Sequence, residues 1–146
     1  MLVVSTSGGT EWGYWGDILN EAAMARGLVI DGGVRDSAGL AGMAFPVFSN
    51  GICINGTIKG FEATAWLEQP IRIGPVVVAQ DDLVVGDRDG VVVLPASSVA
   101  QALTAGAARE RYEANKIARI RAGERTIDIY GFGETGGPFA PAVRPV

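Results

Sequence analysis

The sequence predicts an α/β fold, and three observations support this class. Apolar residues 2–5 have the composition of a strand, a helical pattern begins at residue 17, and a second apolar run begins at residue 28. Short β-like runs follow between residues 46 and 94, and a long helical pattern covers residues 97–121. The order strand, helix, strand at the start favours α/β over an all-α or all-β protein.

Composition and charge limit the class of protein. The length of 146 residues fits one domain, and the 48% hydrophobic content and mean hydropathy of +0.25 favour a well-buried core, a large subunit interface, or both. The chain has no apolar run of about 18 residues, and its start lacks the basic region of a signal peptide. A net charge of −4 argues against a nucleic-acid surface, and the single cysteine, Cys53, suits a reducing compartment. We therefore expect a cytoplasmic protein without membrane or nucleic-acid partners, in which Cys53 is a buried small hydrophobe.

Histidine is absent from the sequence. This absence excludes a Ser-His-Asp triad, an imidazole general base and zinc bound by histidine. Any catalysis would therefore depend on carboxylates, arginine, lysine, tyrosine, backbone groups, water, or a metal with oxygen ligands.

The first half of the chain is expected to alternate strands with a helix. Residues 2–5 form the first strand, and the loop at 6–10 is either a simple turn, which is the favoured interpretation, or a cradle of amides for an anion. Asp17 is the expected N-cap of a helix that stops at Gly27. The apolar face of this helix comprises Ile18, Leu19, Ala22 and Ala23. The preceding aromatic residues favour packing or an interface over a stacking platform: Trp12, Tyr14 and Trp15.

The second half is expected to be rich in strands before one long helix. A short helix covers residues 37–43 and ends before Pro46. Strands are expected at residues 46–48, 51–54, 71–73, 75–79, 83–85 and 91–94, with a hairpin turn at 86–90. The long helix starts at Ser97 or Ser98, has a candidate break at Gly106, and ends at Gly123. The sequence thus predicts one domain over residues 1–130 and a loosely ordered Gly/Pro-rich tail over 131–146.

Two charged residues, Arg35 and Asp36, follow the central apolar run. Residues 28–30 are an expected buried strand, which is expected to end in a turn at Asp-Gly-Gly, residues 31–33. An arginine can hold a carboxylate in one orientation through two parallel hydrogen bonds, and a neighbouring aspartate can hold a hard cation such as Mg²⁺. The pair could therefore bind a small oxo-acid and stabilise negative charge that develops on it. The alternative is an ion pair on the surface after a strand.

Longer motifs surround this pair. Residues 7–17 contain Gly16-Asp17, residues 30–36 read Ile-Asp-Gly-Gly-Val-Arg-Asp, and residues 86–95 contain the expected hairpin. These segments resemble the RraA-like family, which includes 4-hydroxy-4-methyl-2-oxoglutarate aldolases, and the resemblance extends over residues 2–130. The resemblance implies a swivelling β/β/α domain in which sheet layers have flanking helices and a long C-terminal helix. It also implies a homotrimer or a dimer of trimers.

The resemblance further implies a class II lyase, of the aldolase or oxaloacetate decarboxylase type. Such an enzyme uses Mg²⁺, or another divalent cation such as Mn²⁺, to cleave a 2-oxo acid to pyruvate through an enolate. By position, the residues that match the substrate-binding loop and helix start are Gly16, Asp17, Ile18 and Leu19. Arg35 matches the substrate-binding arginine and Asp36 the metal-binding aspartate. Asp17 and Arg35 would then be catalytic, with Asp17 relaying a proton through water and Arg35 neutralising the enolate.

Two other functions remain open under the same resemblance. One is a non-catalytic RraA-type regulator that binds a ribonuclease or helicase, and the other is an inactive truncated paralogue. Asp17 favours the enzyme, because the regulators usually lack an acidic residue before this helix. Glu110 and Glu113 on the long helix could reach a neighbouring subunit's site, although a solvated helix face is the favoured interpretation. Lys59 could be a cation in the site, although a solvated lysine is the favoured interpretation.

The chain departs from the family pattern in two places. Residues 18–34 separate Asp17 from Arg35, about three fewer than the family's motif usually has. Three residues correspond to nearly one helical turn, so the helix is expected to end early if Asp17 is to stay aligned with Arg35. The family also has an N-terminal portion before the strand that begins here. Its absence from this sequence predicts exposed apolar surface or reliance on partner subunits.

Overall fold

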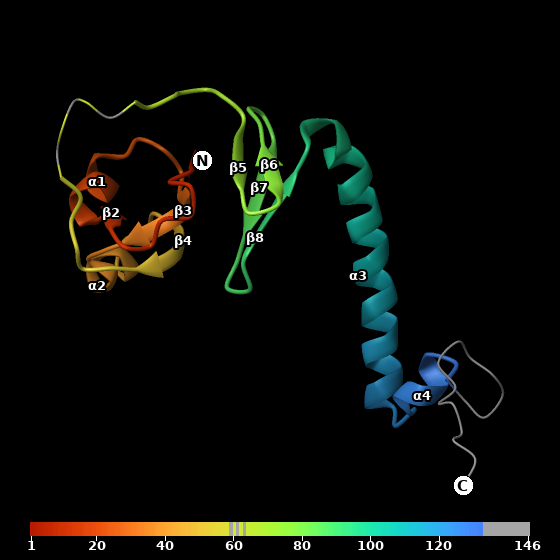
Figure 1. The fold of residues 1–146 in the computed structure, drawn as a ribbon. Helices are drawn as coiled ribbons and strands as arrows, with labels where there is room; N and C mark the ends of the chain where they lie inside the picture. The colour runs from red at the N-terminus through yellow and green to blue at the C-terminus, as the bar shows by residue number, and fades with distance from the viewer. Residues whose placement is uncertain (59, 61, 63, 133–146) are drawn as a thin grey trace, which may run out of the picture. The chain divides into compact units, whose positions relative to one another are not determined.

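The computed structural model describes residues 1–58, 60, 62 and 64–132 (Figure 1). The chain divides into two compact units, Met1–Val99 and Ala100–Val146. The first unit holds all the strands of the described part, so the expected α/β class is confirmed. Lys59 and most of the predicted tail, residues 133–146, lie outside the described residues. Within the described part, no helix is both long and apolar enough to cross a membrane.

A four-stranded parallel sheet forms the centre of the first unit. Its middle strand, β3 (Leu28–Val34), pairs with β1 (Leu2–Val4), β2 (Gly13–Trp15) and β4 (Val47–Ile52). Every residue of β3 is buried, as expected for a strand that has neighbours along both edges. The hydrophobic core of the unit consists of Leu28, Ile30, Val34 and Leu40.

The turn expected at residues 31–33 is wrong, because these residues continue β3. Gly32 and Gly33 let neighbouring segments pack closely against β3, and they do not turn the chain. A Cβ on Gly32 would come within 2.5 Å of Thr6 Oγ1, and one on Gly33 would overlap the carbonyl oxygen of Trp12. Asp31 is also buried, and its carboxylate accepts hydrogen bonds from the Ser5 hydroxyl, at 2.9 Å, and from the Thr6 amide. Asp31 therefore anchors the loop after β1.

Helix α1 (Asp17–Ala22) differs from its prediction in three ways. Its N-cap is Gly16, and Asp17 is the first helical residue. It ends at Ala22 and does not reach Gly27. Its expected apolar face is wrong, since Ile18 and Leu19 are 72% and 47% exposed, whereas Asn20 is buried. A six-residue helix has too few turns to bury a broad apolar stripe, so a polar contact holds it.

The other predicted elements of the first unit are mostly confirmed. Helix α2 (Ser37–Ala41) follows Asp36, and β4 runs as one strand where two were expected. Two antiparallel hairpins come next, β5 (Ile71–Ile73) with β6 (Val76–Val78) and β7 (Leu83–Gly86) with β8 (Val91–Leu94). The predicted turn at 86–90 is closed by the Asp87 amide, which donates to the Gly90 carbonyl at 3.0 Å. Cys53 is only half-buried, so its predicted full burial is wrong.

Helix α3 (Val99–Arg121) follows a short 3₁₀ turn, η1 (Ala96–Ser98), and makes up most of the described residues of the second unit. The helix is continuous through Gly106, so the candidate break there is wrong, whereas the predicted stop is confirmed by Gly123, whose φ is +91°. A short helix that the sequence did not predict, α4 (Thr126–Ile129), comes next. Lys116 is buried between two rings, 4.2 Å from the centroid of Tyr112 and 3.6 Å from that of Tyr130.

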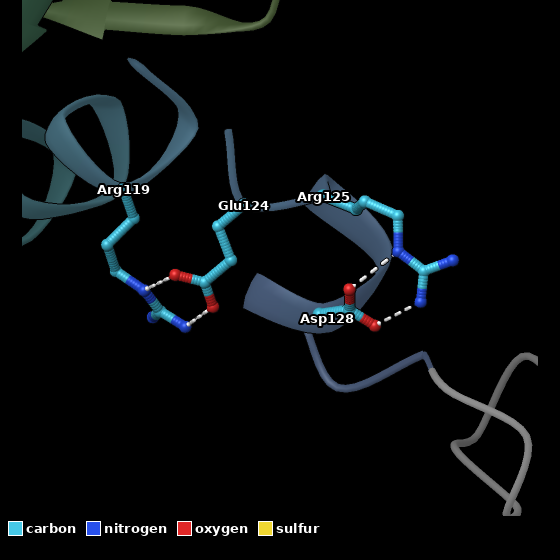
Figure 2. Close-up of polar contacts among 4 residues, drawn as sticks. All are labelled: Arg119, Glu124, Arg125 and Asp128. Atoms are coloured by element: carbon cyan, nitrogen blue, oxygen red, sulfur yellow. Dashed lines mark hydrogen bonds and ion pairs between the residues drawn. The ribbon is translucent and has the colours of Figure 1, made fainter. Parts of the chain in front are cut away.

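Two ion pairs lie near the junction of α3 and α4: Arg119 of α3 pairs with Glu124, and Arg125 pairs with Asp128 at the start of α4 (Figure 2). Arg119 donates through Nε to Glu124 at 2.7 Å, and Arg125 donates to both carboxylate oxygens of Asp128 at 2.7 and 2.9 Å. These guanidinium groups lower the pKa of Glu124 and of Asp128 through the hydrogen bonds they donate.

Candidate active site

Arg35 and Asp36 connect the end of β3 to the start of α2. The Arg35 amide donates to the carbonyl oxygen of Trp15 at 2.8 Å, so the chain stays in register with β2 as it leaves the sheet. Asp36 then adopts a left-handed conformation, with φ 57° and ψ 36°. Such conformations are uncommon for residues other than glycine, and strained backbone of this kind gathers at functional sites. Asp36 Oδ2 lies 3.6 Å from Arg35 Nε, so the two partly exposed side chains form an ion pair, which is the arrangement that the alternative interpretation of the sequence expected.

The Arg35 side chain lies on three glycines, Gly13, Gly16 and Gly56, which we call the glycine floor. A Cβ built on Gly13 would lie 2.9 Å from Arg35 Cβ, one on Gly16 would lie 3.2 Å from Nε, and one on Gly56 would lie 3.7 Å from Nη1. The Arg35 side chain is nevertheless 41% exposed. The Arg35 side chain therefore packs against the glycine floor on one side, and its guanidinium stays accessible to an anion.

Sequence reasoning identified Gly16 but missed the other two glycines. Gly13 begins β2, and Gly56 lies beyond β4, where it forms an isolated parallel bridge with Gly13. The Gly13 amide also donates to the Asn55 carbonyl at 2.7 Å. Only this tertiary bridge brings Gly56 to Arg35, and no local pattern in the sequence signals it.

The start of α1 lies beside Asp36. The Asp17 amide is directed at Asp36 Oδ2 with a separation of 3.4 Å, and the Asp17 carboxylate accepts from the Ile18 amide at 2.7 Å. The first turn of an α-helix leaves its amides without carbonyl partners inside the helix, which here concerns residues 16–19. Ile18 and Leu19 have apolar side chains, so they can bind an anion only through their backbone amides, and the Ile18 amide already donates to Asp17. The structure thus brings Gly16, Asp17, Arg35 and Asp36 together.

The early end of α1 accommodates the short spacing between Asp17 and Arg35. Because the helix stops at Ala22, residues 23–27 form the whole connection to β3. The Asp17 amide stays within 3.4 Å of the Asp36 carboxylate despite the shortening. The helix therefore ends before the stop predicted at Gly27, and this early end keeps the start of α1 beside Asp36.

The donors at this site fit a hydrated Mg²⁺ ion better than a metal enclosed by protein. Within residues 1–58, 60, 62 and 64–132, no group of three or more His, Cys, Asp or Glu residues could hold a metal. Mg²⁺ needs no such group, since it is usually bound through one or two carboxylates and keeps several waters beside the oxygens of a substrate. Asp36, whose side chain is 36% exposed, is one such carboxylate, whereas the Asp17 carboxylate accepts from the Ile18 amide.

The two other acidic candidates belong to α3. Glu110 and Glu113 lie in the second unit, where Glu113 forms an ion pair with Arg109 on the next turn of the same helix. A solvated pair of this type contributes little to stability.

Comparison with known proteins identifies the family of this chain. A family model described as RraA-like, Aldolase/RraA, matches residues 1–93. A Halalkalibacterium halodurans protein, provisionally assigned as a 4-hydroxy-4-methyl-2-oxoglutarate aldolase, is 30% identical over 132 residues, which cover 84% of this chain and 62% of that protein.

Solved structures give the same result. An uncharacterised Pseudomonas syringae protein superposes with a TM-score of 0.72 at 29% identity, over 84% of this chain and 62% of that one. RraAS2 of Streptomyces coelicolor, an unusual member of the RNase ES inhibitor RraA family, superposes with a TM-score of 0.68 at 29% identity, over 82% and 61%. The chain thus spans less than two thirds of the length of these relatives. Together with the family match, they show that this chain belongs to the RraA-like family.

Proposed function

We propose that this protein is a divalent-metal-dependent carbon–carbon lyase that cleaves a 2-oxo acid to pyruvate, as aldolases and oxaloacetate decarboxylases of class II do. One observation carries the proposal. The Arg35 guanidinium, the Asp36 carboxylate and the Asp17 amide converge, with Asp36 Oδ2 3.6 Å from Arg35 Nε and 3.4 Å from the Asp17 nitrogen. The similarity to the Halalkalibacterium halodurans relative supports the same class of reaction.

Each residue has a role that follows from its chemistry. Arg35 binds the substrate carboxylate through two hydrogen bonds and fixes its orientation. The Asp17 and Ile18 amides already donate to the Asp36 and Asp17 carboxylates, so the further donors at the start of α1 are the amides of Gly16 and Leu19. When the carbon–carbon bond breaks, its electron pair enters the pyruvate enolate and Arg35 offsets the negative charge. The other fragment leaves as CO₂ in a decarboxylation, or as a second oxo compound in an aldol cleavage, where Asp17 first takes the hydroxyl proton through a bound water. A water beside Asp17 then protonates the enolate carbon. A divalent cation held by Asp36 would supply Lewis-acid stabilisation of the keto oxygen.

We also propose that the protein assembles as a homotrimer or a dimer of trimers. Large apolar side chains beside the glycine floor support an assembly, because Ile52, Ile54 and Ile58 are 72%, 91% and 92% exposed. Light scattering would measure the mass in solution, and a monomer at micromolar concentration would contradict this assembly.

The direct test of the lyase proposal is pyruvate release from oxaloacetate with and without Mg²⁺. Free Mg²⁺ itself promotes the loss of CO₂ from oxaloacetate, so the rate without protein is subtracted. Asp36→Asn removes the charge that holds the cation, and we expect turnover to fall about 100-fold. Asp81→Asn is the matched control, because Asp81 is also an exposed aspartate with positive φ, 70° against 57° for Asp36. Equal turnover in the two variants, or no turnover in the folded wild type, would contradict the proposal.

The second candidate is a non-catalytic regulator that binds a ribonuclease or helicase. The similarity to RraAS2 is the observation that favours it. Stable binding to such an enzyme, combined with no Mg²⁺-dependent turnover, would support the regulator and reject the lyase.

A further inference from the structure

Asn20 is the one side chain that α1 buries. It is 3% exposed, whereas Ile18 and Leu19 on the same helix are 72% and 47% exposed. Burying an amide is favourable only when its donor and acceptor groups find partners. Because α1 buries an asparagine in place of its neighbouring apolar residues, we infer that directional hydrogen bonds, which apolar contact does not provide, fix this helix.

The Asn20 amide has partners on both of its polar atoms. Its Oδ1 accepts from Trp15 Nε1 at 2.9 Å, and its Nδ2 donates to Met43 Sδ at 3.0 Å. Its backbone amide donates to the Gly16 carbonyl at 3.0 Å, which closes the first turn of α1. Asn20 thus joins three segments through directional bonds.

These partners belong to the segments that carry the site. Trp15 ends β2, and its carbonyl oxygen receives the Arg35 amide. Met43 lies just beyond α2, the helix that begins after Asp36 and packs against α1. The Asn20 side chain therefore ties the helix that begins with Asp17 to the segments that fix Arg35 and Asp36.

We propose that Asn20 is a positioning residue, which holds α1 so that Asp17 stays beside the Arg35–Asp36 pair during the reaction. The inference rests on the proposed lyase function. Apolar contact alone is non-directional and would let a six-residue helix shift along its neighbours, whereas two hydrogen bonds define one position. Displacement of a catalytic group by about 1 Å can lower a rate by about 100-fold, so even a small shift of α1 matters.

The test compares Asn20→Leu with Glu21→Leu. Both variants place the same side chain on α1, but Glu21 is exposed and makes none of the Asn20 contacts. We expect Asn20→Leu to raise amide hydrogen exchange of residues 16–22 about tenfold. We also expect it to lower kcat for oxaloacetate about tenfold while KM changes less than about threefold, because the glycine floor still holds Arg35. Glu21→Leu should leave exchange, kcat and KM near their wild-type values.

A purely structural role would give a different result. If Asn20 only stabilised the fold, kcat and KM per folded molecule, measured well below the melting temperature of each variant, would equal the wild-type values. This outcome would overturn the inference. Trp15→Phe keeps Asn20 but removes the indole donor, so it provides a second variant if Asn20→Leu does not fold; we expect kcat to fall about threefold. If the wild type shows no turnover, the lyase proposal fails. Separately, if the amides of residues 16–22 exchange at the wild-type rate in Asn20→Leu, Asn20 does not hold α1 in position.

Discussion

Gly16→Ala should damage the site because the added methyl group would stand where the Asp36 carboxylate lies. Gly16 has φ −149° and ψ −172°, an extended conformation that alanine adopts without strain. The effect of Gly16→Ala is therefore steric and does not come from backbone strain. The added Cβ would overlap Asp36 Oδ2, far inside the 3.0 Å that real contacts respect, and it would lie 3.2 Å from both Cγ and Nε of Arg35.

The magnitude follows from this overlap. Asp36 must move by roughly 1 Å to restore a normal contact, and a displacement of that size costs about 100-fold in rate, or about 2.7 kcal/mol of transition-state stabilisation. Asp36 is partly exposed, so its side chain can turn toward solvent and the fold should lose little stability. We therefore expect a large loss of activity in a folded protein.

The assay measures Mg²⁺-dependent pyruvate release from oxaloacetate together with urea unfolding. Gly39→Ala is the matched control, because a Cβ on Gly39 would meet Asp17 Cβ at 3.6 Å, an ordinary contact, and alanine favours helix α2. This control should keep wild-type kcat/KM and unfold at a slightly higher urea concentration. A Gly16→Ala protein with at least half of the wild-type kcat/KM would refute the packing described for Asp36.

Three other predictions address the arginine, the central strand and the α3–α4 junction. Arg35→Lys removes the paired hydrogen bonds, so KM for oxaloacetate should rise about tenfold in steady-state kinetics, and an unchanged KM would contradict the role of Arg35. Gly32→Ala places a Cβ 2.5 Å from Thr6 Oγ1, so it should lower the free energy of unfolding in urea by about 1–3 kcal/mol. The lowered pKa of Glu124 and of Asp128 means that their ion pairs stabilise the junction fully above the ordinary values of 4.5 and 3.8. That stabilisation is lost as the pH falls through the lowered values, so the protection of the amides of residues 119–129, which is their hydrogen exchange relative to the intrinsic rate at each pH, should fall on acidification, and this fall should shrink in Glu124→Gln.

The order of elements could be predicted because apolar periodicity is a local property. The strand at β1, the short helix α2 and the β7–β8 hairpin all follow from residues close together in sequence. Arg35 and Asp36 could be proposed as a pair because they are adjacent and lie in a longer motif.

The remaining features depend on tertiary contacts that no local pattern shows. Asp31 and its two following glycines have the composition of a turn, yet they lie inside β3 because neighbouring segments pack where a side chain would stand. Asn20 is buried in place of Ile18 because Trp15 and Met43 offer it hydrogen bonds. Gly56 reaches Arg35 only through its bridge to Gly13.

A crystal structure with oxalate and Mg²⁺ tests the central claim most directly, since oxalate resembles the pyruvate enolate in shape and charge. We expect one oxalate to accept hydrogen bonds from the Arg35 guanidinium and from the amides of Gly16 and Leu19, with Mg²⁺ held by Asp36 and bound to the same ligand. Oxalate and Mg²⁺ bound elsewhere, with Arg35 still on the glycine floor, would contradict the claim that these residues form one site.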